Sequence, residues 1–207
     1  MSKIGDSVTS SSSEIDSHSF VLGFETKLNN NDSLGFAIQL GQSDVDVGTN
    51  GTNLDGEDYS LAVYRARPLA DNHFIAGTIG VGVIESDLKR VSGANTLTGS
   101  RDGTQIFGSV KYGKTLNKGD FSLTPIGRVD LGYTELDSYT ETGTNALSYD
   151  KQTIESGLAS VGVEINNIIK FSNSSLKPFG SLEYGLDFSN SSDAKMNYVS
   201  DSSTKYN

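Results

Sequence analysis

The sequence predicts an all-β protein, an antiparallel up-and-down β-barrel that spans a membrane. Three observations support this prediction. Apolar residues recur at every second position along most of the 207 residues. Short turns alternate with longer polar loops, and the second face of each strand carries mainly small residues. No stretch keeps a helical period for more than two turns.

Eight segments have the alternation expected of strands. In the fourth segment, Ile79 and Val81 fall on one face, while Thr78 and Gly80 fall on the other. The eight segments are His18–Leu28, Leu34–Val47, Asp58–Arg67, His73–Lys89, Gly103–Thr115, Phe121–Tyr139, Gln152–Ile169 and Leu176–Phe188.

The connections between these segments alternate in length, as in outer-membrane barrels with short periplasmic turns and long extracellular loops. The short turns are rich in Asn, Asp, Gly and Ser, which suit tight hairpins. They are Asn29–Asp32, Pro68–Asn72, Asn117–Asp120 and Lys170–Ser175. Longer polar loops are expected at Gly48–Glu57, Arg90–Arg101 and Thr140–Lys151, and after Asn190.

An internal repeat supports a series of hairpins. The stretch Leu123–Leu131 reappears as Leu176–Tyr184, and each copy follows a short turn and has a proline at its third position. Proline has no amide donor and is tolerated near the first residues of a strand. The repeat therefore marks two strand starts on the same rim.

Alternation alone fits either a soluble β-sandwich or a membrane barrel, and the second face favours the barrel because it is small and carries few charges. Oppositely charged groups in a confined lumen are expected to pair. The lumen candidates are Lys111, Arg128, Asp130, Glu164 and Glu183. The lipid-facing candidates are Phe36, Ile38, Ile79, Val81, Val129, Leu131 and Leu182, and the interfacial aromatic candidates are Tyr59, Tyr133, Tyr184 and Phe188.

Composition excludes several classes of protein. Only 35% of residues are hydrophobic and 23 are glycine, which is poor material for a thick, dry core. There is no cysteine for a disulfide or a thiol nucleophile, and a net charge of −10 argues against nucleic-acid partners. The longest apolar run, Phe74–Ile84, is too short for a spanning helix, and Met1–Ser17 has no apolar stretch that could act as a secretory signal.

No residue is assigned a catalytic, cofactor-binding or metal-binding role. The two histidines, His18 and His73, sit at the starts of expected strands, and no nucleophile-elbow motif accompanies them. Acidic residues gather near the long loops, and Asn53–Asp58 only partly resembles a calcium loop. A solvated acidic rim is the preferred interpretation, and divalent-ion bridges to lipopolysaccharide are the alternative.

The order of these motifs resembles a known family. The stretch LTPIGRVDLGYTELDSYTETGTNALSYDKQTIES, from Leu123 to Ser156, is followed by the glycine-bearing strand Gly157–Glu164. Upstream lie Ser33–Ala37, Tyr59–Tyr64 and Asn72–Ile75. Together these segments are similar to the autotransporter β-domain, the C-terminal translocator of type V secretion, over about Ser17 to Asn190.

The resemblance implies a barrel in the outer membrane of a Gram-negative bacterium, commonly of twelve strands. Such a barrel supports the export of its own N-terminal passenger with help from the outer-membrane assembly machinery, among lipid and lipopolysaccharide. This chain departs from the pattern because it has about eight strands and no closing strand, passenger or lumen helix. It is therefore expected to be a fragment.

The glycine-rich lumen face also suits a barrel larger than eight strands, in which something else fills the lumen. The expected division is a polar tail or linker over residues 1–16, the barrel portion over 17–190, and a polar loop with the start of a truncated strand over 191–207. The alternatives to a translocator are a passive outer-membrane pore, a surface adhesin, or a soluble β-sandwich binding module.

Overall fold

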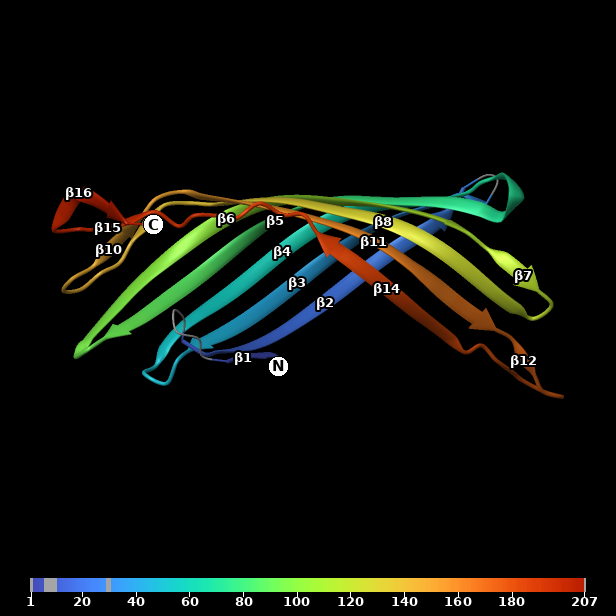
Figure 1. Cartoon of the computed structure of the whole chain (residues 1–207), viewed down its shortest axis with the longest axis horizontal. Coiled ribbons are helices and arrows are strands. Elements are labelled where there is room, and N and C mark those ends of the chain that lie inside the picture. Colours follow the sequence, from blue (N-terminus) through green and yellow to red (C-terminus); the bar gives the residue numbers. More distant parts are fainter. Residues whose placement is uncertain (1, 6–10, 29–30, 207) are drawn as a thin grey trace.

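One strongly curved antiparallel sheet makes up most of the molecule. The structure is a computed structural model that describes residues 2–5, 11–28 and 31–206. The sheet curls into an open trough with a convex and a concave face (Figure 1). Its long strands are β2 (Ser13–Lys27), β3 (Ser33–Val47), β4 (Thr52–Pro68), β5 (His73–Ser92), β6 (Asn95–Lys114), β8 (Phe121–Leu136), β11 (Gln152–Asn167) and β14 (Phe179–Asp187).

The long strands follow one another in the sheet in sequence order, so the topology is an up-and-down meander. The short β1 (Ser2–Ile4) pairs with β2, and β7 (Leu116–Lys118) pairs with β8. The eight segments expected from the sequence correspond to the eight long strands, so this prediction is confirmed. Among the described residues no helix is long and apolar enough to cross a membrane.

The two ends of the trough differ. At one end, here called the turn end, the connections are short and include the 3-10 turn η2 (Ala70–Asn72) and the hairpin of β12 (Ile169–Lys170) with β13 (Ser175–Leu176). At the other end, called the loop end, four short strands form a second small sheet (Figure 1). These strands are β9 (Tyr139–Thr140), β10 (Leu147–Tyr149), β15 (Met196–Tyr198) and β16 (Asp201–Tyr206).

The prediction of two long loops from the sequence is wrong. Most of Gly48–Glu57 and Arg90–Arg101 is strand, and the actual turns are only Gly48–Gly51 and Gly93–Ala94. Gly48, Gly51 and Gly93 have φ of 66°, 84° and 60°, the left-handed conformation that such tight turns require. The polar residues that resembled loops are the outward positions of strands that continue beyond the apolar band.

The convex face carries a band of large apolar side chains, and none of the described residues forms a second layer over it. The seven lipid-facing candidates range from 42% exposed at Ile38 and Val129 to 75% at Leu182. Among residues 11–28 and 31–206, the buried apolar residues are only Leu97, Ile126 and Ala146. The β-sandwich alternative is therefore wrong, because a sandwich would bury this band against a second sheet.

Glycines on the concave face make room for large side chains from neighbouring strands. The Tyr64 ring lies over Gly35, and the Phe107 ring lies over Gly80. A Cβ atom placed on Gly80 would come within 2.3 Å of the Phe107 ring and 2.9 Å of the Leu61 carbonyl oxygen. The abundance of glycine on this face is thus a packing requirement as well as a compositional feature.

We expect Gly80→Ala to lower the free energy of unfolding by about 1–3 kcal/mol, because the new methyl group meets both a ring and backbone. Gly77→Ala on the same strand is the matched control, since its Cβ atom would lie 3.5 Å from the nearest atom, the Ser109 carbonyl oxygen. Urea unfolding of the folded form, followed by gel mobility, measures both. Equal stability of the two variants would contradict this packing.

Candidate functional site: the concave wall

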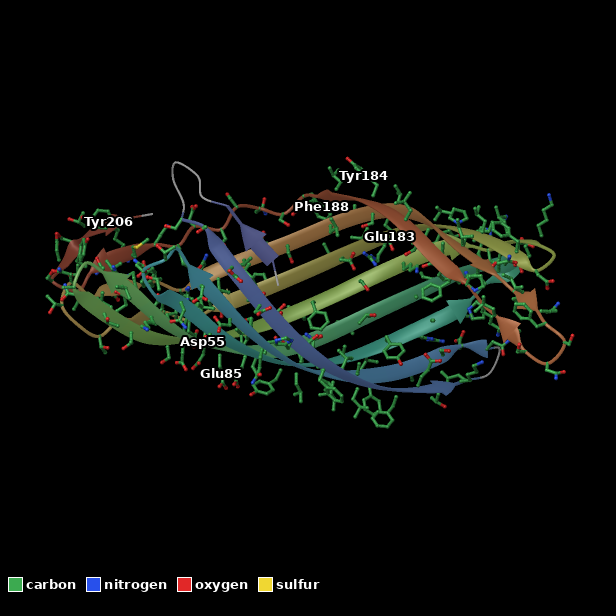
Figure 2. The ribbon with its side chains drawn as sticks, turned by 90° about the horizontal axis from the view of Figure 1, so that it is seen from below. Asp55, Glu85, Glu183, Tyr184, Phe188 and Tyr206 are labelled. Carbon is green, nitrogen blue, oxygen red and sulfur yellow. The ribbon has the colours of Figure 1, made fainter. Side chains whose placement is uncertain are left out.

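The charged residues expected to face a lumen come together on the concave face. Lys111 on β6, Arg128 on β8 and Ser160 on β11 are cross-strand neighbours and so share one face. Glu183 on β14 pairs with Gly162 of β11. Figure 2 shows Glu183 over the hollow of the trough and Tyr184 on the side that faces away from it.

These five residues form two ion-paired groups. The Lys111 ammonium group contacts the Glu164 carboxylate. Arg128 Nε lies 2.9 Å from Asp130 Oδ2, and Arg128 Nη2 lies 3.2 Å from Glu183 Oε2. Every charge that the sequence placed in this set has an oppositely charged partner within it.

The ion-paired groups give the wall a wet, nearly neutral surface. Two cations and three carboxylates leave a net charge of −1, and the five side chains remain 26–37% exposed. Partly exposed ion pairs contribute little to stability and do not hold a passing ligand tightly. Such a wall can contact a polar chain without trapping it.

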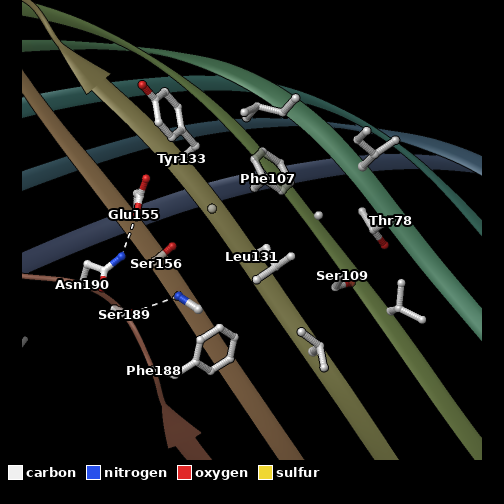
Figure 3. A pocket seen from close by; sticks show the side chains of 17 residues that line it. Thr78, Phe107, Ser109, Leu131, Tyr133, Glu155, Ser156, Phe188, Ser189 and Asn190 are labelled. Carbon is white, nitrogen blue, oxygen red and sulfur yellow. Dashed lines mark hydrogen bonds between the residues drawn. The ribbon is translucent and has the colours of Figure 1, made fainter.

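On the convex side of the same strands, the surface is apolar and has a shallow groove of about 590 Å³ (Figure 3). Leu131 lines the groove, Gly108 deepens it and Phe188 borders it at one end. The aromatic candidates are exposed on this face, from 41% at Tyr59 to 73% at Tyr184. The sequence reading missed Tyr112, whose hydroxyl oxygen lies 2.5 Å from Nδ1 of His73.

Beyond the apolar band, toward the loop end, the convex face is acidic. Asp16, Asp44, Asp55 and Asp87 are cross-strand neighbours on four successive strands. Figure 2 shows Asp55 and Glu85 outside the hollow of the trough. Partial desolvation and the charges of Asp55, Asp46 and Asp16 raise the pKa of Asp44. The sequence placed Asp55 in an expected loop, whereas the structure aligns it on β4 with the acidic residues of the neighbouring strands.

An interaction that the sequence reading missed anchors the third loop. Arg90 Nε and Nη2 donate hydrogen bonds of 2.7 and 2.6 Å to the two carboxylate oxygens of Glu141, whose side chain is only 4% exposed. The Leu147 amide donates a third hydrogen bond to this carboxylate. Fully buried Leu97 lies beside the loop. Because Arg90 and Glu141 are 51 residues apart, no local motif signals their pairing.

The two histidines do not form a catalytic site. His18 on β2 is opposite Gln42 of β3, and His73 begins β5 and faces Tyr112. They belong to opposite ends of the trough, since β2 runs away from the loop end and β5 starts at the turn end. Within the part of the chain that the structure describes, no three His, Asp or Glu residues are grouped to hold a metal ion.

A family model described as the autotransporter beta-domain matches residues 2–207, which is nearly the whole chain. The chain belongs to the autotransporter β-domain family. No curated protein sequence matches it significantly. This autotransporter β-domain is an outer-membrane translocator barrel that supports export of a linked passenger, and the family match favours it over a passive pore or adhesin.

Solved structures support the fold of this autotransporter β-domain. The translocator domain of the autotransporter NalP from Neisseria meningitidis has a TM-score of 0.73 and 16% identity, with 89% of this chain and 70% of that chain covered. The β-domain of the Bordetella autotransporter BrkA has a TM-score of 0.68 and 12% identity, with 90% and 76% covered. In an outer-membrane barrel the longer connections are extracellular, so the loop end, which carries the long connections of the second small sheet, is extracellular and the turn end is periplasmic.

We expect Arg128→Gln to lower the free energy of unfolding by up to about 1 kcal/mol, because Asp130 and Glu183 lose their shared cation. Adding Glu183→Gln should restore part of this loss, since one of the two uncompensated carboxylates is then removed. Urea titration of the wild type, the two single variants and the double variant measures the coupling. Strictly additive effects would show that Arg128 and Glu183 do not interact.

We expect acid to release the Glu141 loop. Burial raises the pKa of Glu141, but hydrogen bonds from Arg90 and Leu147 outweigh burial and hold the pKa below its ordinary value. A lowered folded-state pKa stabilises the fold at neutral pH, and this contribution is lost as pH falls from the ordinary glutamate range through the lowered pKa. Protease cleavage within residues 140–150 on intact cells, after brief incubation at each pH, should therefore increase in acid.

Glu141→Gln provides the control for this prediction, because it removes the titrating group. The variant loop should already be cleaved faster at neutral pH, and its cleavage should not change further in acid. A variant loop as protected as the wild type at neutral pH would rule out the Arg90–Glu141 anchor.

Proposed function

We propose that the concave face lines the path of the exported passenger and that the convex apolar band contacts lipid. The observation that carries this proposal is the separation of polarity within one continuous register. On β14, Glu183 joins the ion pairs of the concave face, while Leu182 and Tyr184 are 75% and 73% exposed on the convex face. The same alternation holds along β3, β5 and β8.

The lumen assignment covers Lys111, Arg128, Asp130, Glu164 and Glu183. Their mutual pairing supports a mechanical role, because each charge is held by an oppositely charged partner within the wall. We assign no catalytic residue. A passing chain would meet hydrated ion pairs and small side chains, which offer weak contacts along the whole path.

The lipid assignment covers Phe36, Ile38, Ile79, Val81, Val129, Leu131 and Leu182, with Tyr59, Tyr133, Tyr184 and Phe188 near the interfaces. Exposure of all these side chains supports it, since water would disfavour so large an apolar band. Lipid and lipopolysaccharide are thus the proposed partners of the convex face. The acidic rows lie where lipopolysaccharide head groups would be, beyond the outer edge of the apolar band.

The outer-membrane assembly machinery is the third proposed partner. Within the described residues, β14 pairs with β11 along one edge, and its other edge has no partner strand. Unpaired backbone groups in lipid cost several kcal/mol each, so this edge requires a strand partner during or after insertion. A machinery that offers a strand edge to the growing sheet would meet that requirement.

We expect Ile79→Arg to reduce outer-membrane insertion, because an arginine near the middle of the lipid face costs about 2–4 kcal/mol. Thr78→Arg is the matched control, since the neighbouring position projects to the opposite face. The folded band that shifts on boiling, counted in outer-membrane fractions, measures insertion. An equal loss in both variants would contradict the assignment of faces.

The same cells test the export function. An epitope placed ahead of residue 1 in the full-length protein should be accessible to protease on intact wild-type cells and should lose accessibility in step with the folded band in Ile79→Arg. A correctly inserted wild-type barrel whose epitope stays protected would overturn the export path proposed for the concave face.

A further inference from the structure

The apolar side chains change face where the strands leave the membrane band. Within the band, Leu40 and Tyr59 lie opposite each other on the convex face. Farther toward the loop end, the convex positions are acidic, for example Asp44 and Asp55. The alternate positions, such as Val45, are apolar and lie on the concave face, because successive side chains of a strand point to opposite faces.

These inward apolar residues form one row across four strands. Ile15 of β2 is opposite Val45 of β3, Val45 is opposite Leu54 of β4, and Leu54 is opposite Leu88 of β5. All four are half-buried. No bulge interrupts the register between these strands, so the four side chains are direct neighbours on one face.

Aromatic rings continue this row around the wall. Leu88 is opposite Gly99 of β6, and the Tyr139 ring lies against Gly99. The Tyr139 ring stacks on Tyr149 with centroids 4.6 Å apart and an angle of 3° between the planes. We call Ile15, Val45, Leu54, Leu88, Tyr139 and Tyr149 the mouth row.

The position of the mouth row restricts what can cover it. Lipid contacts only the convex face, so it cannot reach a row on the concave face. The row is continuous with the wall that carries the Arg128 ion pairs, and it lies at the extracellular end of that wall. A polypeptide that passes along the wall must cross it before leaving the barrel. The row carries no charge of its own, so it would contact apolar side chains.

We propose that the mouth row is an apolar contact site for the exported polypeptide at the exit of the barrel. This inference rests on the proposed function, in which the concave face lines the export path. The polar wall lets the chain slide within the membrane, and the mouth row then holds apolar side chains of the passenger transiently by excluding water from them. Such holding at the exit opposes backward movement of the chain.

The test compares two neighbouring positions in the full-length protein. Leu54→Asp places a charge in the mouth row, whereas Asn53→Asp places the same charge on the convex face one residue away. Pulse-labelled passenger should reach the surface several-fold more slowly in Leu54→Asp, and at the wild-type rate in Asn53→Asp and in Leu54→Met. The folded band that shifts on boiling should be unchanged in all three. Wild-type export by a folded Leu54→Asp barrel would overturn the proposal.

A second measurement applies even if Leu54→Asp fails to assemble. The chain contains no cysteine, so Leu54→Cys and Asn53→Cys each introduce a single thiol. With cysteines placed in the passenger, oxidation during export should trap a disulfide with Leu54→Cys and none with Asn53→Cys. Adducts in neither variant, or in both equally, would overturn the contact.

These outcomes are separable from failure of the proposed function. If the wild-type epitope never reaches the surface, the export path itself is wrong. If it does reach the surface while Leu54→Asp and Leu54→Cys behave like their neighbours, the path stands and the mouth row is instead covered by the facing wall of the barrel.

Discussion

The constraint on which the rest of the structure depends is the pairing of backbone amides in a sheet with no water on its outer side. Lipid offers no hydrogen-bond partner, so every spanning strand must satisfy its N–H and C=O groups with its neighbours. The long strands from β3 to β11 meet this constraint by an unbroken antiparallel ladder with a partner on both sides, whereas β14 has a partner only on the side of β11. Curvature and the separation of faces follow from this ladder, because a twisted sheet with one apolar side curls around its polar side.

The sequence predicted the spanning parts of the strands well, because one face of each lies in a uniform environment. Phe36 and Ile38 alternate with Ala37 and Gln39, and this period of two defines a strand whatever its neighbours are. Prediction failed where the environment changes. Beyond the band, Asp55 and Glu57 interrupt the apolar pattern, so Gly48–Glu57 resembled a loop although Leu54 keeps the same period on the opposite face.

The candidate site was predictable only in part, for a related reason. Lys111, Arg128, Asp130, Glu164 and Glu183 were recognisable because each is a charge among small residues on an otherwise alternating strand. Which residue pairs with which depends on strand order and register, as in the pairing of Lys111 with Glu164. The contact between Arg90 and Glu141 depends on the path of a loop, and the bond between Tyr112 and His73 joins two strand ends, so neither leaves a local signal.

The change of face at the membrane boundary limits how the extracellular hairpins can vary in length. The β3–β4 turn needs only Gly48–Gly51, so any residue gained or lost on one side of it shifts the strand by one pleat. A shift of one position would exchange the acidic and apolar faces above the shift, whereas a shift of two would preserve them. The hairpins can therefore lengthen by two residues on each strand and extend farther from the membrane without altering the membrane-spanning part. In such hairpins, an even number of inserted residues on each strand should matter more than which residues are inserted.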